Sequence, residues 1–214
     1  MLKVYRPIES GEFIVIGGDP AAGGSDYSAM QFLSVTKLDV PMVYHSPKLA
    51  TEMTNEVFPV LEKIQQITGI NPTIAYERQN GGVFEMDRLS SLNRLNKFTI
   101  FKMPRYGDVH HQSEVKLGWD TNTATRPKML ADLKEAVDKN LITIYDRPTI
   151  EEMFSFIIVK TTMSEKAMAE SGAHDDLVMS LAIAWQLYQM TPKPNPIQDE
   201  QAREIYYQRA NEDF

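Results

Sequence analysis

An apolar run that closes on two glycines and an acid constrains the fold of this chain most. Residues 13–16 read Phe-Ile-Val-Ile, and Gly17, Gly18 and Asp19 follow directly. A short apolar run bounded by glycines is typical of a buried strand, so Asp19 is predicted to lie at a strand end. The same order recurs at residues 73–77, where Glu77 ends the run before Asn80-Gly81-Gly82. Two such strands predict two carboxylates at the edge of a sheet.

The remaining periodicity predicts an α/β fold with a mixed sheet. Residues 29–37 and 42–45 have strand character, with residues 39–41 between them, which together with residues 13–19 predicts three antiparallel strands first. From residue 70 onward strands and helices alternate, as in sheets with parallel members. Helices are expected at 49–68, 82–95, 126–139 and 177–188, strands at 98–103, 141–145 and 154–160, and a polar hairpin or long loop at 106–125.

Length and composition predict one globular domain with a loose end. The chain has 214 residues, of which 43% are hydrophobic, and residues 1–190 are expected to form the domain. Residues 191–214 are rich in proline and charge, and we expect a flexible C-terminal tail. No apolar run reaches the roughly 20 residues of a membrane span, and no signal peptide is evident, so a soluble intracellular protein without a membrane partner is expected.

The absence of cysteine limits the metal chemistry. With no cysteine and four histidines, a bound metal would depend mainly on carboxylate oxygens, which suit hard cations such as Mg²⁺ and Mn²⁺. The formal net charge of -7 argues against nucleic-acid binding when taken alone. Residues 88–134, however, hold nine bases and four acids. This stretch fits either a nucleic-acid contact or a solvated surface of mixed charge.

A third acidic feature, Asp175-Asp176, opens the predicted last helix. Each acid also has a structural interpretation: Asp19 before Pro20 fits an Asx turn, Glu77 fits an ion pair with Arg78, and Asp175 or Asp176 fits a helix N-cap. If the acids instead gather at one sheet edge, their repulsion calls for divalent cations. Two such cations ~3.5 to 4 Å apart can support phosphodiester hydrolysis.

Four motifs in order resemble a known family. They are Gly-Asp-Pro-Ala-Ala-Gly-Gly-Ser-Asp-Tyr-Ser at 18–28, Tyr-Glu-Arg-Gln-Asn-Gly-Gly at 76–82, Gly-Trp-Asp-Thr at 118–121 with Thr-Arg-Pro at 125–127, and Gly-Ala-His-Asp-Asp-Leu-Val at 172–178. The chain resembles the C-terminal nuclease domain of the large terminase subunits of tailed bacteriophages. The resemblance implies an RNase H-like (Holliday-resolvase-like) fold and a catalytic, metal-binding site of Asp19, Glu77, Asp175 and Asp176. Asp26 is a weaker ligand candidate.

The resemblance also implies a function. It implies a metal-dependent endonuclease that cuts concatemeric double-stranded viral DNA by a two-metal reaction with Mg²⁺ or Mn²⁺ and little sequence specificity. No Gly-x-x-x-x-Gly-Lys-Ser/Thr motif is present, so this chain carries no packaging ATPase domain, and an excised nuclease domain is favoured. The implied partners are the ATPase domain of the same terminase, the portal and the small terminase subunit. A monomer in the host cell cytoplasm is expected.

The remaining basic, aromatic and histidine residues have less specific predictions. Four bases are candidate phosphate contacts: Arg105, Lys116, Arg126 and Lys128. Tyr106 and Trp119 either stack on a base or, as we prefer, pack in a small core, and His110 and His111 are expected at the surface. Two rival functions stay open, an actin-like nucleotide-binding module and a non-catalytic packaging subunit with a structural metal. The first predicts a second glycine-rich phosphate loop, which the sequence lacks.

Overall fold

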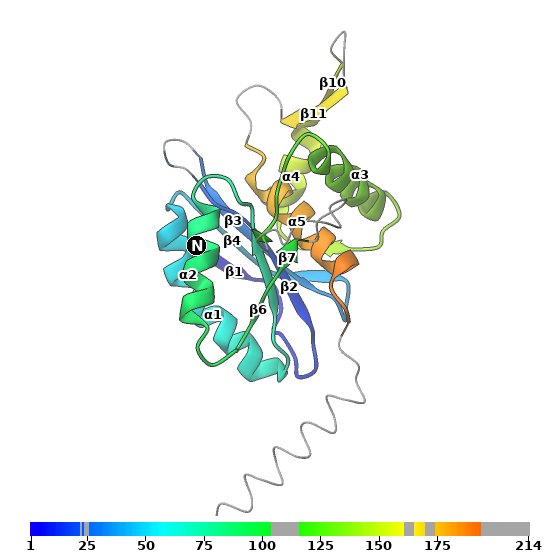
Figure 1. Cartoon of the computed structure of the whole chain (residues 1–214). Coiled ribbons are helices and arrows are strands. Elements are labelled where there is room, and N and C mark those ends of the chain that lie inside the picture. The colour runs from blue at the N-terminus through cyan, green and yellow to red at the C-terminus, as the bar shows by residue number, and fades with distance from the viewer. Residues whose placement is uncertain (22, 24–25, 104–115, 161–164, 170–173, 194–214) are drawn as a thin grey trace, which may run out of the picture.

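Seven strands form a mixed sheet in the computed structural model, which describes residues 1–21, 23, 26–103, 116–160, 165–169 and 174–193 (Figure 1). The strand order is β1-β4-β3-β2-β5-β6, and β9 pairs with β4. The strands of this sheet are β1 (Leu2–Val4), β2 (Ile14–Asp19), β3 (Ser28–Ser34), β4 (Asp39–Ser46), β5 (Thr73–Tyr76), β6 (Thr99–Ile100) and β9 (Thr143–Ile144).

Helices and two small strand pairs complete the described part of the chain. The helices are α1 (Ala50–Thr68), α2 (Gly82–Leu92), α3 (Thr125–Asp138), α4 (Arg147–Ser155) and α5 (Asp176–Met190). The strand pairs are β7 (Lys102–Met103) with β8 (Lys116–Leu117), and β10 (Phe156–Lys160) with β11 (Glu165–Ala169). No helix in these described ranges has the length and apolar character needed to cross a membrane.

The strand directions confirm the predicted mixed sheet. Strands β2, β3 and β4 are antiparallel neighbours. Strand β5 runs parallel to β2, and β6 runs parallel to β5. The antiparallel start and the later parallel members follow from the change in connection, because short turns join antiparallel strands whereas helices carry the chain back to parallel ones.

Alternating side chains divide the core into two layers. Ile14 and Ile16 of β2 pack on the face covered by α1 and α2, whereas Val15 packs on the face covered by α3 and α5. Figure 1 shows α1 and α2 on one side of the sheet and α3, α4 and α5 on the other. Because side chains alternate between two covered faces, the inner strands β2, β3 and β5 are buried at every position.

Helix α5 lies against β2 without intervening side chains. A Cβ atom at Gly17 would lie 2.2 Å from the carbonyl oxygen of Ser180 and 2.4 Å from the backbone nitrogen of Ala184. Gly17 is therefore needed for close approach of helix and strand, and not for turn formation. The contact fixes where the first turn of α5 lies relative to the end of β2.

Several elements differ from those predicted. Strand β4 already begins at Asp39, because Arg6 and Tyr145 satisfy that buried carboxylate. The segment at 98–103 divides into β6 and β7 at Phe101, because its N–H still donates to the Ile74 carbonyl oxygen of β5 whereas its own carbonyl oxygen accepts the Gly118 N–H. Strands β1 and β11 and helix α4 were not predicted; strand β10 begins at Phe156 because α4 extends to Ser155.

Two sequence-based predictions fall partly or wholly outside the described residues. Strands β7 and β8 pair antiparallel at the base of the expected polar hairpin, and residues 104–115 lie outside the described part. The predicted tail at 191–214 is described only to Lys193. The division into a domain at 1–190 and a tail at 191–214 stays a prediction.

The close packing of α5 on Gly17 predicts a strong effect of one methyl group. Gly17→Ala is expected to lower the free energy of unfolding by about 3 kcal/mol, because backbone atoms cannot move aside as a flexible side chain can. Urea denaturation measures the loss. Gly11→Ala is the matched control: its Cβ would enter open space at φ +82°, so only a conformational cost of about 1 kcal/mol is expected. Equal losses in the two variants would contradict this account of the packing.

Candidate metal and nuclease site

The parallel pairing of β2 and β5 brings two predicted site residues together. Gly18 is the register partner of Tyr76, and the Glu77 N–H donates to the carbonyl oxygen of Gly18 at 2.7 Å. Asp19 and Glu77 therefore follow one another across the pair, and each is only 7% exposed. Burial of Glu77 excludes its interpretation as an exposed partner of Arg78, whose guanidinium instead donates to the carbonyl oxygen of Leu117 at 2.6 Å.

The Asp19 and Glu77 carboxyl groups lie close enough to interact electrostatically. Burial raises the pKa of Asp19 well above its ordinary value, and the charges of Glu77, Asp176 and Asp175 raise it further. The site is thus a buried acidic cluster, and the Asx-turn interpretation of Asp19 does not account for it.

Helix α5 contributes the second half of the cluster. Asp175 is the residue before the helix and Asp176 is its first residue. Burial, together with the nearby charges of Asp175 and Asp26, raises the pKa of Asp176 to about 6 although the Tyr27 N–H donates to its carboxylate at 3.4 Å. Asp26 itself is exposed. All four predicted acids therefore interact electrostatically at one edge of the sheet.

Two glycines permit the close approach of the loop after β5. A Cβ at Gly82 would lie 1.7 Å from the carbonyl oxygen of Glu77, so only glycine fits where α2 begins. The preceding Gly81 has φ +88°, a left-handed conformation that glycine adopts without strain. The Asn80-Gly81-Gly82 sequence therefore turns the chain at once and keeps Glu77 at the strand end.

In the described part of the chain, two basic side chains approach the acids: Arg126, and His174, whose Nδ1 lies 3.7 Å from Asp176 Oδ2. The Arg126 guanidinium, at the start of α3, donates to Asp175 Oδ2 at 2.6 Å, and both side chains are 33% exposed. Among the described residues Asp19 and Glu77 take part in no ion pair. Within the same residues no three His, Asp or Glu side chains converge closely enough to hold a metal ion. The Arg126 guanidinium occupies Asp175 Oδ2, and the oxygen chemistry of the four carboxylates suits a hard divalent cation.

The other predicted DNA contacts lie in different surroundings. Lys116 pairs with Asp120 at 2.7 Å, and Lys128, which is 68% exposed, pairs with Asp132. These ion pairs fit the mixed-charge surface that the sequence left open. Arg105, Tyr106, His110 and His111 lie outside the described residues. Trp119 is 3% exposed and packs near Phe101, which confirms packing over base stacking for this residue.

The sequence did not point to Glu152, a half-buried carboxyl group of α4. Its Oε1 accepts the Val178 N–H at 2.7 Å in the first turn of α5. Burial, with the charges of Asp176 and Asp175, raises its pKa to about 8. The signal that α4 exists is Asp146-Arg147-Pro148, an acid followed by proline in the first turn of a helix.

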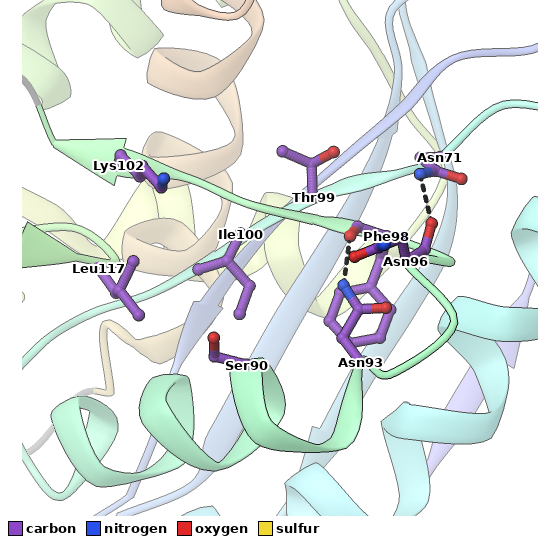
Figure 2. A pocket seen from close by; sticks show the side chains of 9 residues that line it. All are labelled: Asn71, Ser90, Asn93, Asn96, Phe98, Thr99, Ile100, Lys102 and Leu117. Carbon is purple, nitrogen blue, oxygen red and sulfur yellow. Dashed lines mark hydrogen bonds between the residues drawn. The ribbon is translucent and has the colours of Figure 1, made fainter.

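A groove on the far edge of the sheet is not part of this site. Its volume is about 320 Å³, and it lies between β6, the end of α2 and β8. Figure 2 shows Asn71 and Asn93 facing backbone carbonyl groups, and each donates at 2.6 Å, to Asn96 and Phe98 respectively. No carboxylate lines the groove, so it offers no site for metal chemistry.

Solved structures give the fold its family context. The nuclease of the large terminase from thermophilic phage G20c with bound cobalt is 17% identical, at a TM-score of 0.60 over 86% of this chain and 84% of that chain. The chain has the fold of a large-terminase nuclease domain. No protein-family model matches it.

Two further terminase nucleases widen the comparison. The large-terminase nuclease domain of Thermus phage P74-26 is 16% identical, at a TM-score of 0.59 over 90% of this chain and 87% of that chain. The manganese-soaked terminase nuclease domain of human cytomegalovirus is 9% identical, at a TM-score of 0.54 over 86% and 90%. The predicted RNase H-like fold is thereby confirmed.

In EDTA, removal of the Asp176 charge is expected to stabilise the protein more at neutral pH than at acidic pH. Folding raises this pKa from its ordinary value to about 6, so the folded chain holds the proton more tightly than the unfolded chain. Stability is therefore lost as the pH rises through these values. Asp176→Asn removes this loss. It should raise the free energy of unfolding by on the order of 1 kcal/mol near pH 7, allowing for solvent screening. Urea denaturation at about pH 4 and about pH 7 measures it.

The matched control is Asp175→Asn. Asp175 pairs with Arg126 at 2.6 Å, so neutralising it removes a favourable contact and no gain is expected. A gain in Asp176→Asn that stays constant with pH would show that repacking, and not the charge, causes it.

Proposed function

We propose that this chain is the metal-dependent DNA endonuclease domain of a viral DNA-packaging terminase. The observation that carries the proposal is the buried pair of Asp19 and Glu77 at adjacent parallel strand ends, beside the start of α5. The fold neighbours support it, because they are nuclease domains of phage large terminases and of the human cytomegalovirus terminase, with cobalt, magnesium or manganese named in several.

The proposed site holds divalent cations through four acids. Asp19, Glu77, Asp175 and Asp176 would supply the oxygen ligands that Mg²⁺ or Mn²⁺ prefers. The chemistry that bound Mg²⁺ or Mn²⁺ would supply there is two-metal hydrolysis of a phosphodiester. The protein contributes carboxylates that are gathered in a buried place, where charge interactions are stronger than in water. Their repulsion is relieved once cations bind, which favours loading.

Arg126 is the base placed best to contact substrate. A cation bound at Asp175 would compete with the guanidinium for the same carboxylate oxygens. Once displaced, Arg126 would lie beside the site and carry a planar donor fork that suits a phosphate. The substrate proposed is double-stranded concatemeric DNA, cut with little sequence preference since phosphate contacts carry no base information. The ATPase domain, the portal and the small terminase subunit are proposed partners, in the host cytoplasm.

Cleavage of supercoiled plasmid with Mn²⁺ or Mg²⁺ tests the activity. Asp19→Ala and Glu77→Ala are each expected to slow cutting by about 100-fold or more, which corresponds to several kcal/mol of lost charge stabilisation. Asp87→Ala, which removes an exposed acid of α2, should cut like wild type. Uncut plasmid with wild-type protein and either metal, or unimpaired cutting by Asp19→Ala, would reject the nuclease assignment. Tight ATP binding would favour the nucleotide-binding alternative.

Salt dependence tests the role of Arg126 on DNA. In an Asp19→Ala background with Mg²⁺, Arg126→Ala should weaken binding to two unrelated duplexes equally and lower the slope of log affinity against log salt by about 1. Fluorescence anisotropy measures both quantities. Lys134→Ala is the control, because Lys134 pairs with Asp138 on the exposed side of α3. An unchanged slope in Arg126→Ala would remove this residue from the interface.

A further inference from the structure

The first turn of α5 is capped by a residue that belongs to another helix. The first N–H groups of a helix lack partners within the helix, and a side chain just before it usually accepts one of them. Asp175 occupies that place, but its side chain makes no capping hydrogen bond and contacts Arg126 instead. Asp175 therefore occupies the capping position, but its side chain does not cap α5.

Glu152 of α4 takes over the capping role. Its Oε1 accepts the Val178 N–H at 2.7 Å, across 26 positions of sequence. The side chain is half-buried, so the bond is sheltered from competing water. One carboxyl group from α4 thereby satisfies a free donor at the start of α5.

Helix α4 is itself held in place by buried polar contacts. Asp146 Oδ2 accepts the Thr149 N–H at 2.9 Å and the Thr149 hydroxyl at 2.7 Å, which caps α4. Gln31 Nε2 then donates to Thr149 Oγ1 at 2.9 Å and to the Leu177 carbonyl oxygen at 3.3 Å. Gln31 lies in β3 and is fully buried, so α4, α5 and the sheet are joined at one point.

We propose that Glu152 is a positioning residue, which caps α5 so that the Asp175 and Asp176 carboxylates stay available to a divalent cation. The inference rests on the proposed function, since it assigns a purpose to these acids. In the absence of Glu152, Asp175 would be the nearest acceptor for the open N–H groups. If the Asp175 carboxylate turned toward the helix to accept these N–H groups, it could not bind a cation at the same time.

Two substitutions separate capping from charge. Glu152→Gln keeps a carbonyl oxygen that can accept the Val178 N–H, whereas Glu152→Ala removes the acceptor. Glu151→Ala is the matched control on the adjacent residue, which pairs with Arg147 at the surface. Hydrogen exchange of the Val178 amide in EDTA reports the cap directly, and calorimetric titration with Mn²⁺ reports cation affinity.

Glu152→Ala is expected to speed Val178 exchange and to weaken Mn²⁺ binding roughly tenfold, as loss of a residue that orients a ligand does. In plasmid cleavage, the Mn²⁺ concentration for half-maximal rate should rise by the same factor while the rate at saturating Mn²⁺ stays close to wild type. Glu152→Gln and Glu151→Ala should match wild type in each measurement.

Three results would overturn the proposal. They are unchanged Mn²⁺ affinity in Glu152→Ala, failure of Glu152→Gln to restore it, and an equal loss in Glu151→Ala. Failure of the glutamine variant would mean that the charge of Glu152 binds the cation itself. Wild-type protein that binds Mn²⁺ but leaves plasmid intact would overturn the nuclease function alone, because exchange and calorimetry still compare the variants.

Discussion

The parallel pairing of β2 with β5 is the constraint on which the rest of the site depends. It places Asp19 beside Glu77 at the carboxyl ends of neighbouring strands, where the Glu77 N–H donates to the Gly18 carbonyl oxygen. Gly17 then allows α5 to lie directly on β2, which delivers Asp175 and Asp176 to the same edge. A shift of β5 by one residue against β2 would turn Glu77 to the opposite face from Asp19.

This arrangement costs stability in the absence of a cation. Buried carboxyl groups repel one another and lose hydration, and the raised pKa values of Asp19 and Asp176 express that cost. The two apolar layers on either side of the sheet hold the site in place regardless. Clusters of this type are common where function, and not folding, selects the residues.

Local patterns made much of the fold predictable. The run that ends in Asp19 and its repetition at Glu77 predicted two strand ends, and the structure places both there. Helical spacing predicted α1, which ends at Gly69, a residue that adopts φ +73°. Each of these signals lies within one element and depends on periodicity or on backbone conformation alone.

What escaped prediction depends on contacts between distant segments. The Arg126 partner of Asp175 lies 49 positions away, and Glu152 reaches Val178 across 26 positions from a helix that was not predicted. A local sequence pattern does not show whether an acid that precedes a helix caps that helix, or whether another residue supplies the cap. Sequence therefore proposed both roles for Asp175, and only the tertiary contacts separate them.

The Glu152–Val178 hydrogen bond also closes a loop that contains the β10–β11 hairpin. Because both ends of this loop are clamped at its base, changes in its length alter mainly the entropy of closure, which grows slowly with the number of residues. The hairpin is therefore a permissive insertion point. Evolution can lengthen or exchange it, and so acquire new surface, without moving the acids that lie only a few residues away.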